Sequence, residues 1–169
     1  FIDTVIPEIL ISDQTFEATI FSGTNMPLEF PEIIDIQNTE LTNDAPEVFP
    51  LGETIVTWTA TDSSGNSASA TQTITVVDTT SPVLIAPESI IQEAINHEAN
   101  PVRIGTSEST DVMDISSVTN DAPEVFPLGE TIVTWTATDS SGNSASATQT
   151  ITVVDTTAPV IVTPENVLS

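Results

Sequence analysis

Hydrophobic and polar residues alternate along two stretches of the chain, residues 53–62 and 67–77. In the first stretch, Val56, Trp58 and Ala60 fall on one face, while threonines occupy the other face. A period of two is typical of β-strands, and a polar face opposite an apolar face indicates a strand that is buried on one side only. We therefore predict two antiparallel strands, and helical periodicity is weak.

The segment between these strands, residues 62–66, reads Asp-Ser-Ser-Gly-Asn. Glycine and asparagine adopt positive φ more readily than other residues, and such residues close the loops of β-hairpins. The two strands are therefore expected to form one hairpin, and the same hairpin recurs near Trp135 and Gly142.

An internal repeat sets the organisation of the chain, because residues 42–80 and residues 119–157 are identical. We predict one repeat over residues 1–77, with a divergent first half, and a second over residues 78–154. Residues 155–169 then open a third unit. They are either a piece of a longer array or a segment that pairs with a neighbouring molecule.

Each unit begins with an aspartate, at Asp3, Asp78 and Asp155. Short Asp-Thr-Thr-x-Pro linkers are predicted to join the repeats. About seven short strands in roughly 77 residues, separated by frequent turn signals, predict an all-β fold of tandem immunoglobulin-like β-sandwiches. The strand pattern places Trp58 and Trp135 in the cores, rather than on the surface as platforms for sugar rings.

Residues 49–68 and 74–82, with their second copy at 126–159, resemble the hyalin repeat, or HYR, module. The resemblance implies an immunoglobulin-like fold and tandem modules in extracellular adhesion and surface proteins. Near-identical tandem copies are also similar to the stalk repeats of prokaryotic, especially archaeal, cell-surface proteins. Gln72 and Gln149 stand where the family usually has an apolar residue, so their amides need partners inside the sandwich.

Composition narrows the possible partners. The 169 residues include 25 Asp and Glu, one basic residue and no cysteine, for a net charge of −24. Nucleic acids and anionic membrane surfaces are excluded as partners, because both are bound through Lys and Arg. Disulfides and thiolate metal sites are impossible. With 38% hydrophobic residues the chain can still bury a core, and no apolar run approaches the roughly 18 residues of a membrane span.

Catalytic constellations are weak. The only histidine is His97, which has no counterpart in the first repeat, and the G-x-S-x-G turn of many serine hydrolases is absent. We expect His97 to lie on an exposed loop and the protein not to be an enzyme. The chain begins at Phe1 without an initiator methionine or a signal pattern, so we expect a mature chain or a fragment.

Calcium is the metal that this composition favours, because it prefers oxygen ligands. Asp62, Ser64 and Asn66 space oxygen atoms at every second residue of the hairpin loop. Aspartates at the joints and beside the linkers could add carboxylates near a domain end. The candidate ligands are Asp62, Asn66, Asp78, Asp139, Asn143, Asp155, Asp44 and Asp121.

Ordinary turn chemistry explains the same residues without a metal. Asp62 and Asn66 can form an Asx-type hairpin turn, and Asp78 can cap a linker. Two arguments favour calcium: the charge of −24 needs compensation, and a sandwich of this size often needs a disulfide, a metal or a neighbour for stability.

The sequence predicts a non-catalytic segment of an extracellular, cell-surface protein, such as a stalk, S-layer or filament component stiffened by divalent cations. Its expected partners are adjacent repeats and copies of itself, and residues 156–169 could add a strand to an acceptor sheet. The alternative is a carbohydrate-binding or accessory module of a secreted hydrolase.

Overall fold

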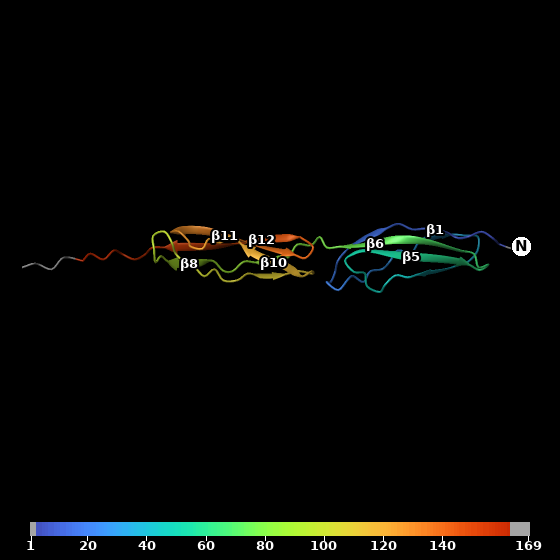
Figure 1. The fold of residues 1–169 in the computed structure, drawn as a ribbon, viewed down its shortest axis with the longest axis horizontal. Coiled ribbons are helices and arrows are strands. Elements are labelled where there is room, and N and C mark those ends of the chain that lie inside the picture. The colour runs from blue at the N-terminus through green and yellow to red at the C-terminus, as the bar shows by residue number, and fades with distance from the viewer. Residues whose placement is uncertain (1–2, 163–169) are drawn as a thin grey trace, which may run out of the picture.

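The computed structural model describes residues 3–162, and every regular element in that range is a β-strand. The strands form two sandwiches that lie end to end, so that the long strands follow the long axis of the molecule (Figure 1). A short linker that follows Val77 joins them. The predicted all-β fold of tandem immunoglobulin-like sandwiches is confirmed.

Each sandwich packs a two-stranded sheet against a four-stranded sheet. In the first repeat β1 pairs with β3, and the larger sheet has the order β2-β6-β5-β4. The strands are β1 (Glu8–Leu10), β2 (Gln14–Glu17), β3 (Glu32–Ile34), β4 (Thr39–Asn43), β5 (Gly52–Asp62) and β6 (Ser67–Val77). Strand β2 runs parallel to β6, whereas the other pairs are antiparallel.

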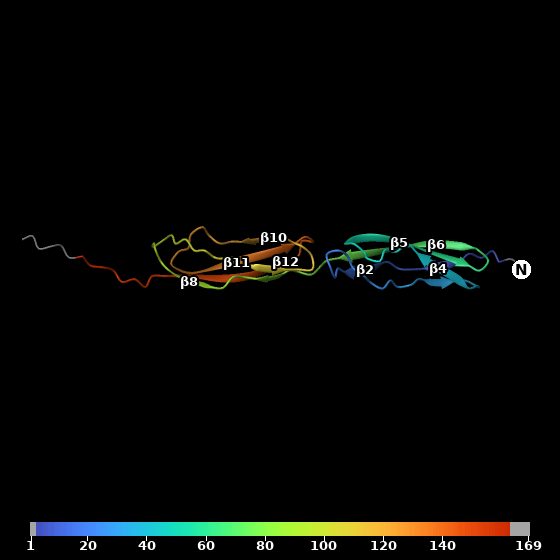
Figure 2. The same ribbon diagram turned by 90° about the horizontal axis from the view of Figure 1, so that it is seen from below.

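The second repeat has the same plan, with β7 paired to β9 and a larger sheet of order β10-β11-β12-β8 (Figure 2). Its strands are β7 (Val83–Ile85), β8 (Ile90–Glu93), β9 (Glu108–Thr110), β10 (Ile115–Asn120), β11 (Gly129–Asp139) and β12 (Ser144–Val154). About seven strands are predicted per repeat. The structure has six strands and one isolated bridge in each, Thr24 with Phe49 and Asn100 with Phe126.

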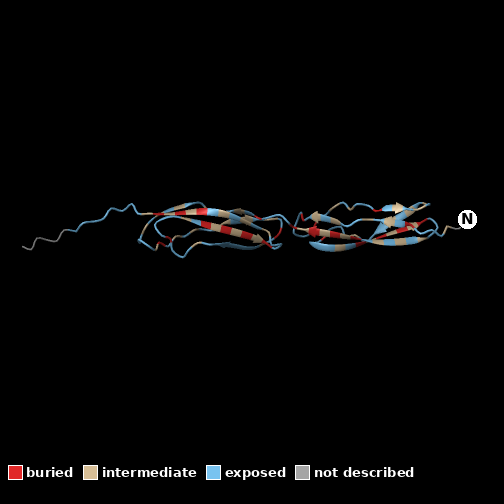
Figure 3. Cartoon of the chain, turned by 90° about the horizontal axis from the view of Figure 1, so that it is seen from above, coloured by how far each residue is buried: buried red, intermediate tan, exposed pale blue. Residues whose placement is uncertain are grey.

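The long hairpin carries most of each core. Strand β5 buries Val56, Trp58 and Ala60, and β6 buries Ile74 and Val76, as their alternation predicts. Figure 3 shows buried positions as separate bands along strands of both sandwiches. The opposite faces pair threonine with serine across the strands, which suits contact with water.

The tip of the hairpin has the expected turn chemistry. The N–H of Asp62 donates to the carbonyl of Asn66 at 2.9 Å, and the N–H of Gly65 donates back to the carbonyl of Asp62 at 3.2 Å. Gly65 has a φ of 89°, which a residue with a Cβ rarely adopts. Gly142 repeats this conformation in the second hairpin with a φ of 95°.

The two repeats touch through a loop of the second. Met113 follows β9 in the sequence, yet its side chain is 4% exposed and belongs to the core cluster of the first repeat, with Ala18 and Phe49. Ala94, which corresponds to Ala18 at the other end of the second repeat, is only half-buried. The difference shows that the second repeat covers the end of the first.

Candidate functional site

The hairpin tip of the second repeat holds the carboxylate of Asp139 in one orientation. Its Oδ1 accepts hydrogen bonds from the N–H groups of Ser141 and Asn143, both at 2.9 Å, and its Oδ2 accepts one from Nδ2 of Asn143 at 3.0 Å. Asp139 is 2% exposed. The Asx-type turn that the sequence allows is therefore present, and it points a fixed carboxylate toward the linker.

Asp78 starts the linker and lies beside this hairpin. Nδ2 of Asn143 also donates to the main-chain carbonyl of Asp78 at 3.1 Å, which ties the linker to the second repeat. Oδ1 of Asp78 accepts a hydrogen bond from the N–H of Thr80 at 3.1 Å, so Asp78 also caps the linker. Its side chain is 9% exposed.

A third carboxylate completes the group, which we call the joint trio: Asp78, Asp111 and Asp139. Each offers one carboxylate oxygen, and these three oxygens lie within 4.8 Å of one another. Like charges so close together repel one another, and the repulsion is stronger where water is partly excluded. The arrangement therefore favours anything that brings positive charge between the three groups.

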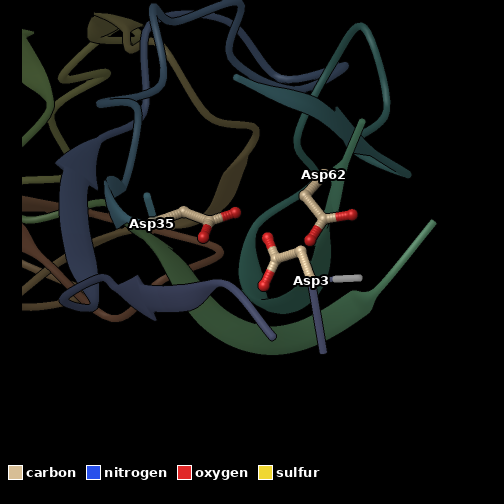
Figure 4. A group of neighbouring side chains, drawn as sticks. All are labelled: Asp3, Asp35 and Asp62. Atoms are coloured by element: carbon tan, nitrogen blue, oxygen red, sulfur yellow. The ribbon is translucent and has the colours of Figure 1, made fainter. Parts of the chain in front are cut away.

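The first repeat has an equivalent group, which we call the N-terminal trio: Asp3, Asp35 and Asp62. Figure 4 shows that their carboxylates point toward a common space between the first residues of the chain, the loop after β3 and the hairpin. Asn66 has the same role as Asn143, because its Nδ2 donates to Oδ2 of Asp62 at 2.7 Å and to the carbonyl of Asp3 at 3.3 Å.

Three carboxylate oxygens in the two trios are buried but accept no hydrogen bond from the described residues. They are Oδ2 of Asp3, Oδ2 of Asp35 and Oδ2 of Asp78. Buried polar atoms in proteins are almost always paired, because an unpaired one loses its hydration without compensation. Each trio therefore has spare acceptor capacity on its inner side.

Hydrogen bonding keeps the hairpin aspartates ionised. Burial raises the pKa of Asp62, but the bonds from the side chain and N–H of Asn66 and from the N–H of Ser64 outweigh it and lower the pKa below its usual value. The pKa of Asp139 is lowered by the same balance, in which Asn143 is the main donor. Protonation of these two aspartates is thus disfavoured.

The structure places the predicted ligands in different roles. Asp62, Asp78 and Asp139 belong to the trios, whereas Asn66 and Asn143 use their amide nitrogens to hold neighbouring groups. The remaining three candidates lie outside the trios. Asp155 is exposed and caps Thr157, and the carboxylates of Asp44 and Asp121 accept hydrogen bonds from the N–H groups of Thr57 and Thr134.

Sequence reasoning missed Asp3, Asp35 and Asp111 as ligand candidates. Asp3 was recognisable as a joint residue but not as part of a cluster. Asp35 and Asp111 lie in first halves that differ in sequence, and their spacing of 76 residues differs from the spacing of 77 between the identical blocks. One signal could have identified them: each first half has an aspartate directly after the strand that pairs with its own first strand, Asp35 after β3 and Asp111 after β9.

The two tryptophans and the histidine match the sequence interpretation. Trp58 and Trp135 are buried, at 0% and 6% exposure. His97 is exposed on a loop, with Nδ1 4.0 Å from Oε1 of Glu98. Among residues 3–162 there is no helix of the length and hydrophobicity that a membrane crossing needs.

Comparison with known proteins agrees with the resemblance seen in the sequence. The family model described as HYR domain matches residues 2–76 and again residues 77–153. The chain is 37% identical to a hyalin of Strongylocentrotus purpuratus and 38% identical to a hyalin of Lytechinus variegatus, over 99% of its own length in both cases. It spans 15% and 35% of the length of these two relatives.

A third relative is the sushi, von Willebrand factor type A, EGF and pentraxin domain-containing protein 1 of Rattus norvegicus. It is 36% identical over 72% of this chain and 4% of its own length. Among solved structures, the EC1-2 segment of human protocadherin-24 aligns with 89% of this chain and 99% of its own, at 12% identity and a TM-score of 0.39. The two family-model matches and the hyalin identities show that this chain belongs to the HYR domain family.

Proposed function

We propose that the chain is a non-catalytic structural segment of an extracellular adhesive protein, in which docked repeats make a stiff rod and divalent cations stiffen the joints. The observation that carries this proposal is the burial of Met113 against the core of the preceding repeat. In a flexible string of independent domains, an apolar side chain of one repeat would not be buried in the core of another.

An extracellular location is supported by the kinds of protein in which related HYR domains occur. Two relatives are hyalins, and a third is named for an EGF domain. EGF domains depend on disulfides, which persist in oxidising, extracellular surroundings. The charge of −24 keeps such a chain soluble and favours association with cations rather than with anionic surfaces.

The joint combines apolar and polar contacts. Met113 belongs to the same core cluster as Ala18, whose N–H donates a hydrogen bond to the carbonyl of Val77 at the end of β6. Glu17 accepts hydrogen bonds from the N–H of Thr79 and the hydroxyls of Thr79 and Thr80, so the linker is anchored to β2. With Asn143 on the other side, the linker is attached to both repeats.

The far end of the second repeat supports an extended array. There a pocket of about 210 Å³ lies beside Ala94, the counterpart of Ala18 in the core cluster that contains Met113. Its lining residues are Ala94, Ile95, Asn96, His97, Leu128 and Asp155. The occupant we propose is the loop of a further HYR repeat, because the only occupant of the matching seat in the described chain is such a loop.

The alternative of a carbohydrate-binding or accessory module has less support. Sugar-binding surfaces usually present flat aromatic rings, and both tryptophans of this chain are buried. The S-layer and filament versions of the proposal remain expectations about the larger assembly.

Small-angle scattering tests the rod. The chain should scatter as one extended particle, and Met113→Ser should shorten its maximum dimension because the repeats then bend about the linker. Val112→Ser, which changes the neighbouring exposed residue, is the control and should leave the dimension unchanged. If the unaltered chain already scatters as two freely jointed domains, the proposal is wrong.

A further inference from the structure

We propose that the joint trio and the N-terminal trio are two binding sites for Ca²⁺, with Asp111 and Asp35 as ligands that complete them. The inference rests on the proposed structural function, since it assigns the cation that stiffens the joint. Its ligands are Asp78, Asp111 and Asp139 in the joint, and Asp3, Asp35 and Asp62 at the start of the first repeat.

The negative charge of the two trios has no positive partner within the described chain. Three carboxylates converge within 4.8 Å in each trio. The basic side chains of the chain are Arg103 and His97, Arg103 is exposed, and the one ion pair within residues 3–162 joins His97 to Glu98. No side chain therefore compensates the trios, and a cation from solution is the group that can.

One carboxylate oxygen of Asp78 has no hydrogen-bond donor. This side chain is more than nine-tenths buried, and its Oδ2 accepts no hydrogen bond from the described chain although Oδ1 is paired with Thr80. The free oxygen belongs to the same carboxylate that contributes to the trio. Asp3 and Asp35 also leave a buried Oδ2 unpaired in the N-terminal trio, although these two side chains as a whole are only half-buried.

Hydrogen bonds within the chain already hold the proposed ligands in place without an ion. Asn143 bonds Oδ2 of Asp139 and the main chain of Asp78, and so fixes two ligands of the joint trio relative to each other. Outer groups that orient ligands in this way are typical of metal sites. The arrangement is built twice, although the first halves of the repeats differ in sequence.

Ligand type favours calcium, and the spacing of the oxygens is compatible with it. Two oxygens bound to one Ca²⁺ at about 2.4 Å can be up to about 4.8 Å apart, and the three oxygens of each trio lie within 4.8 Å of one another. Mg²⁺ requires bonds of about 2.0–2.1 Å in a strict octahedron, and Zn²⁺ favours His and Cys, which neither trio contains. Asp111 and Asp35 are half-buried, so water can reach the ion and complete its coordination.

Binding in the joint trio also positions the docking loop. The N–H of Met113 donates to Oδ2 of Asp111 at 3.2 Å, so this aspartate lies two residues from the side chain that packs on the first repeat. Fixing Asp111 to Asp78 and Asp139 therefore holds the loop, the linker and the hairpin together. The ion acts on the joint by ordering the segment that carries Met113.

Equilibrium dialysis of the full chain against Ca²⁺ in 150 mM NaCl tests the assignment, at the concentrations of about 10⁻⁴–10⁻³ M that are typical of extracellular sites. The unaltered chain should bind two ions with Ca²⁺ preferred over Mg²⁺. Asp111→Asn should remove one ion, Asp35→Asn should remove the other, and the double variant should bind neither. Asp114→Asn, an exposed acid of the same loop, is the charge-matched control and should keep both.

Equal binding by the Asp111→Asn and Asp114→Asn variants would show that Ca²⁺ only screens the charge, and would overturn the assignment. Circular dichroism of each variant establishes that it is folded, and Asp35→Asn gives an independent result if the joint variant does not fold. A chain that scatters as a stiff rod without binding Ca²⁺ would overturn the sites but not the proposed function.

Discussion

The indole Nε1 of Trp58 donates a 3.0 Å hydrogen bond to Oε1 of Gln72, and both side chains are fully buried. Nε2 of Gln72 donates in turn to the carbonyl of Ser12 at 2.8 Å. A polar amide in an otherwise apolar core is thus satisfied at both ends, and it connects the long hairpin to the segment between β1 and β2. Gln149 makes the corresponding bond to Trp135 at 3.2 Å.

Replacing Gln149 by methionine should destabilise the second repeat by about 3 kcal/mol, since an orphaned buried polar group costs about 1–3 kcal/mol. The change leaves the indole of Trp135 and the carbonyls of Glu88 and Ile104 without their partner. Urea denaturation monitored by tryptophan fluorescence measures the loss. Gln92→Met, at a half-buried position of β8, should have a smaller effect.

The combination of Gln149→Met with Trp135→Phe, measured by circular dichroism because the second repeat then has no tryptophan, checks the cause. Phenylalanine has no N–H that needs an acceptor, so Gln149→Met leaves no unpaired indole in this background. The double variant should therefore lose less stability than the sum of the two single variants. Strict additivity would contradict a coupling between these side chains.

Stability should fall in acid partly through Glu93. The N–H of Thr156, then the hydroxyls of Thr156 and Thr157, donate to this carboxylate and lower its pKa. A carboxyl with a lowered folded-state pKa stabilises the protein above its ordinary pKa of about 4.3, and the contribution is lost as the pH falls through the folded value. Glu17 makes the same contacts at the joint.

Unfolding measured from pH 7 down to pH 3 tests this link. The Glu93→Gln variant should lose less stability over that range than the unaltered chain. Glu130→Gln, which removes an exposed acid on β11, is the charge-matched control. An unchanged slope in the Glu93 variant would contradict the assignment.

Calcium should raise the thermal midpoint more than equal ionic strength of sodium does. An ion present at 10 to 100 times its dissociation constant stabilises the folded state by about 1.4–2.7 kcal/mol per site. Melting in EDTA, then in Ca²⁺, Mg²⁺ or Na⁺ at matched ionic strength, separates binding from screening. Asp78→Ala should remove the part of the calcium-specific gain that the joint trio supplies and leave the part from the N-terminal trio, and an equal rise with sodium would count against the joint site.

Removal of residues 156–169 should abolish any assembly that depends on strand exchange. Residues 163–169 of this predicted donor segment lie outside the described residues, while Val160, Ile161 and Val162 are about 85% exposed and in no strand. Electron microscopy and sedimentation would detect filaments of the unaltered chain and their loss.

A shorter deletion, of residues 158–169, keeps the threonines that bind Glu93 and is the better control for folding. If filaments survive either deletion, strand exchange through this segment is wrong and assembly must use another contact.

The sequence was sufficient to predict the sandwiches because the signal is local. Alternation in 53–62 and 67–77 determines which side chains are buried, and the turn residues at 62–66 determine the register of the hairpin. The two glutamines could be recognised as exceptions from their place in this alternation. Their partners could not, because the carbonyls of Ser12 and Glu88 come from segments about 60 residues away.

The trios were predictable only in part. Asp62 and Asp139 are in a turn motif, and Asp78 begins a repeat, so each carries a local signal. Asp35 and Asp111 reach the same place through the pairing of β1 with β3 and of β7 with β9, which no short motif encodes. The seating of Met113 on another repeat is likewise a property of the assembled chain.

In the first repeat, the position that corresponds to Met113 is occupied by Gln37. Its amide oxygen accepts hydrogen bonds from the hydroxyls of Ser63 and Ser64 within its own repeat. A methionine at this position can pack into the preceding repeat, whereas the glutamine is hydrogen-bonded within its own repeat. In a long array of such repeats, we therefore expect stiff joints where this residue is apolar and flexible joints where it is polar. One loop residue per repeat would then determine where the array can bend.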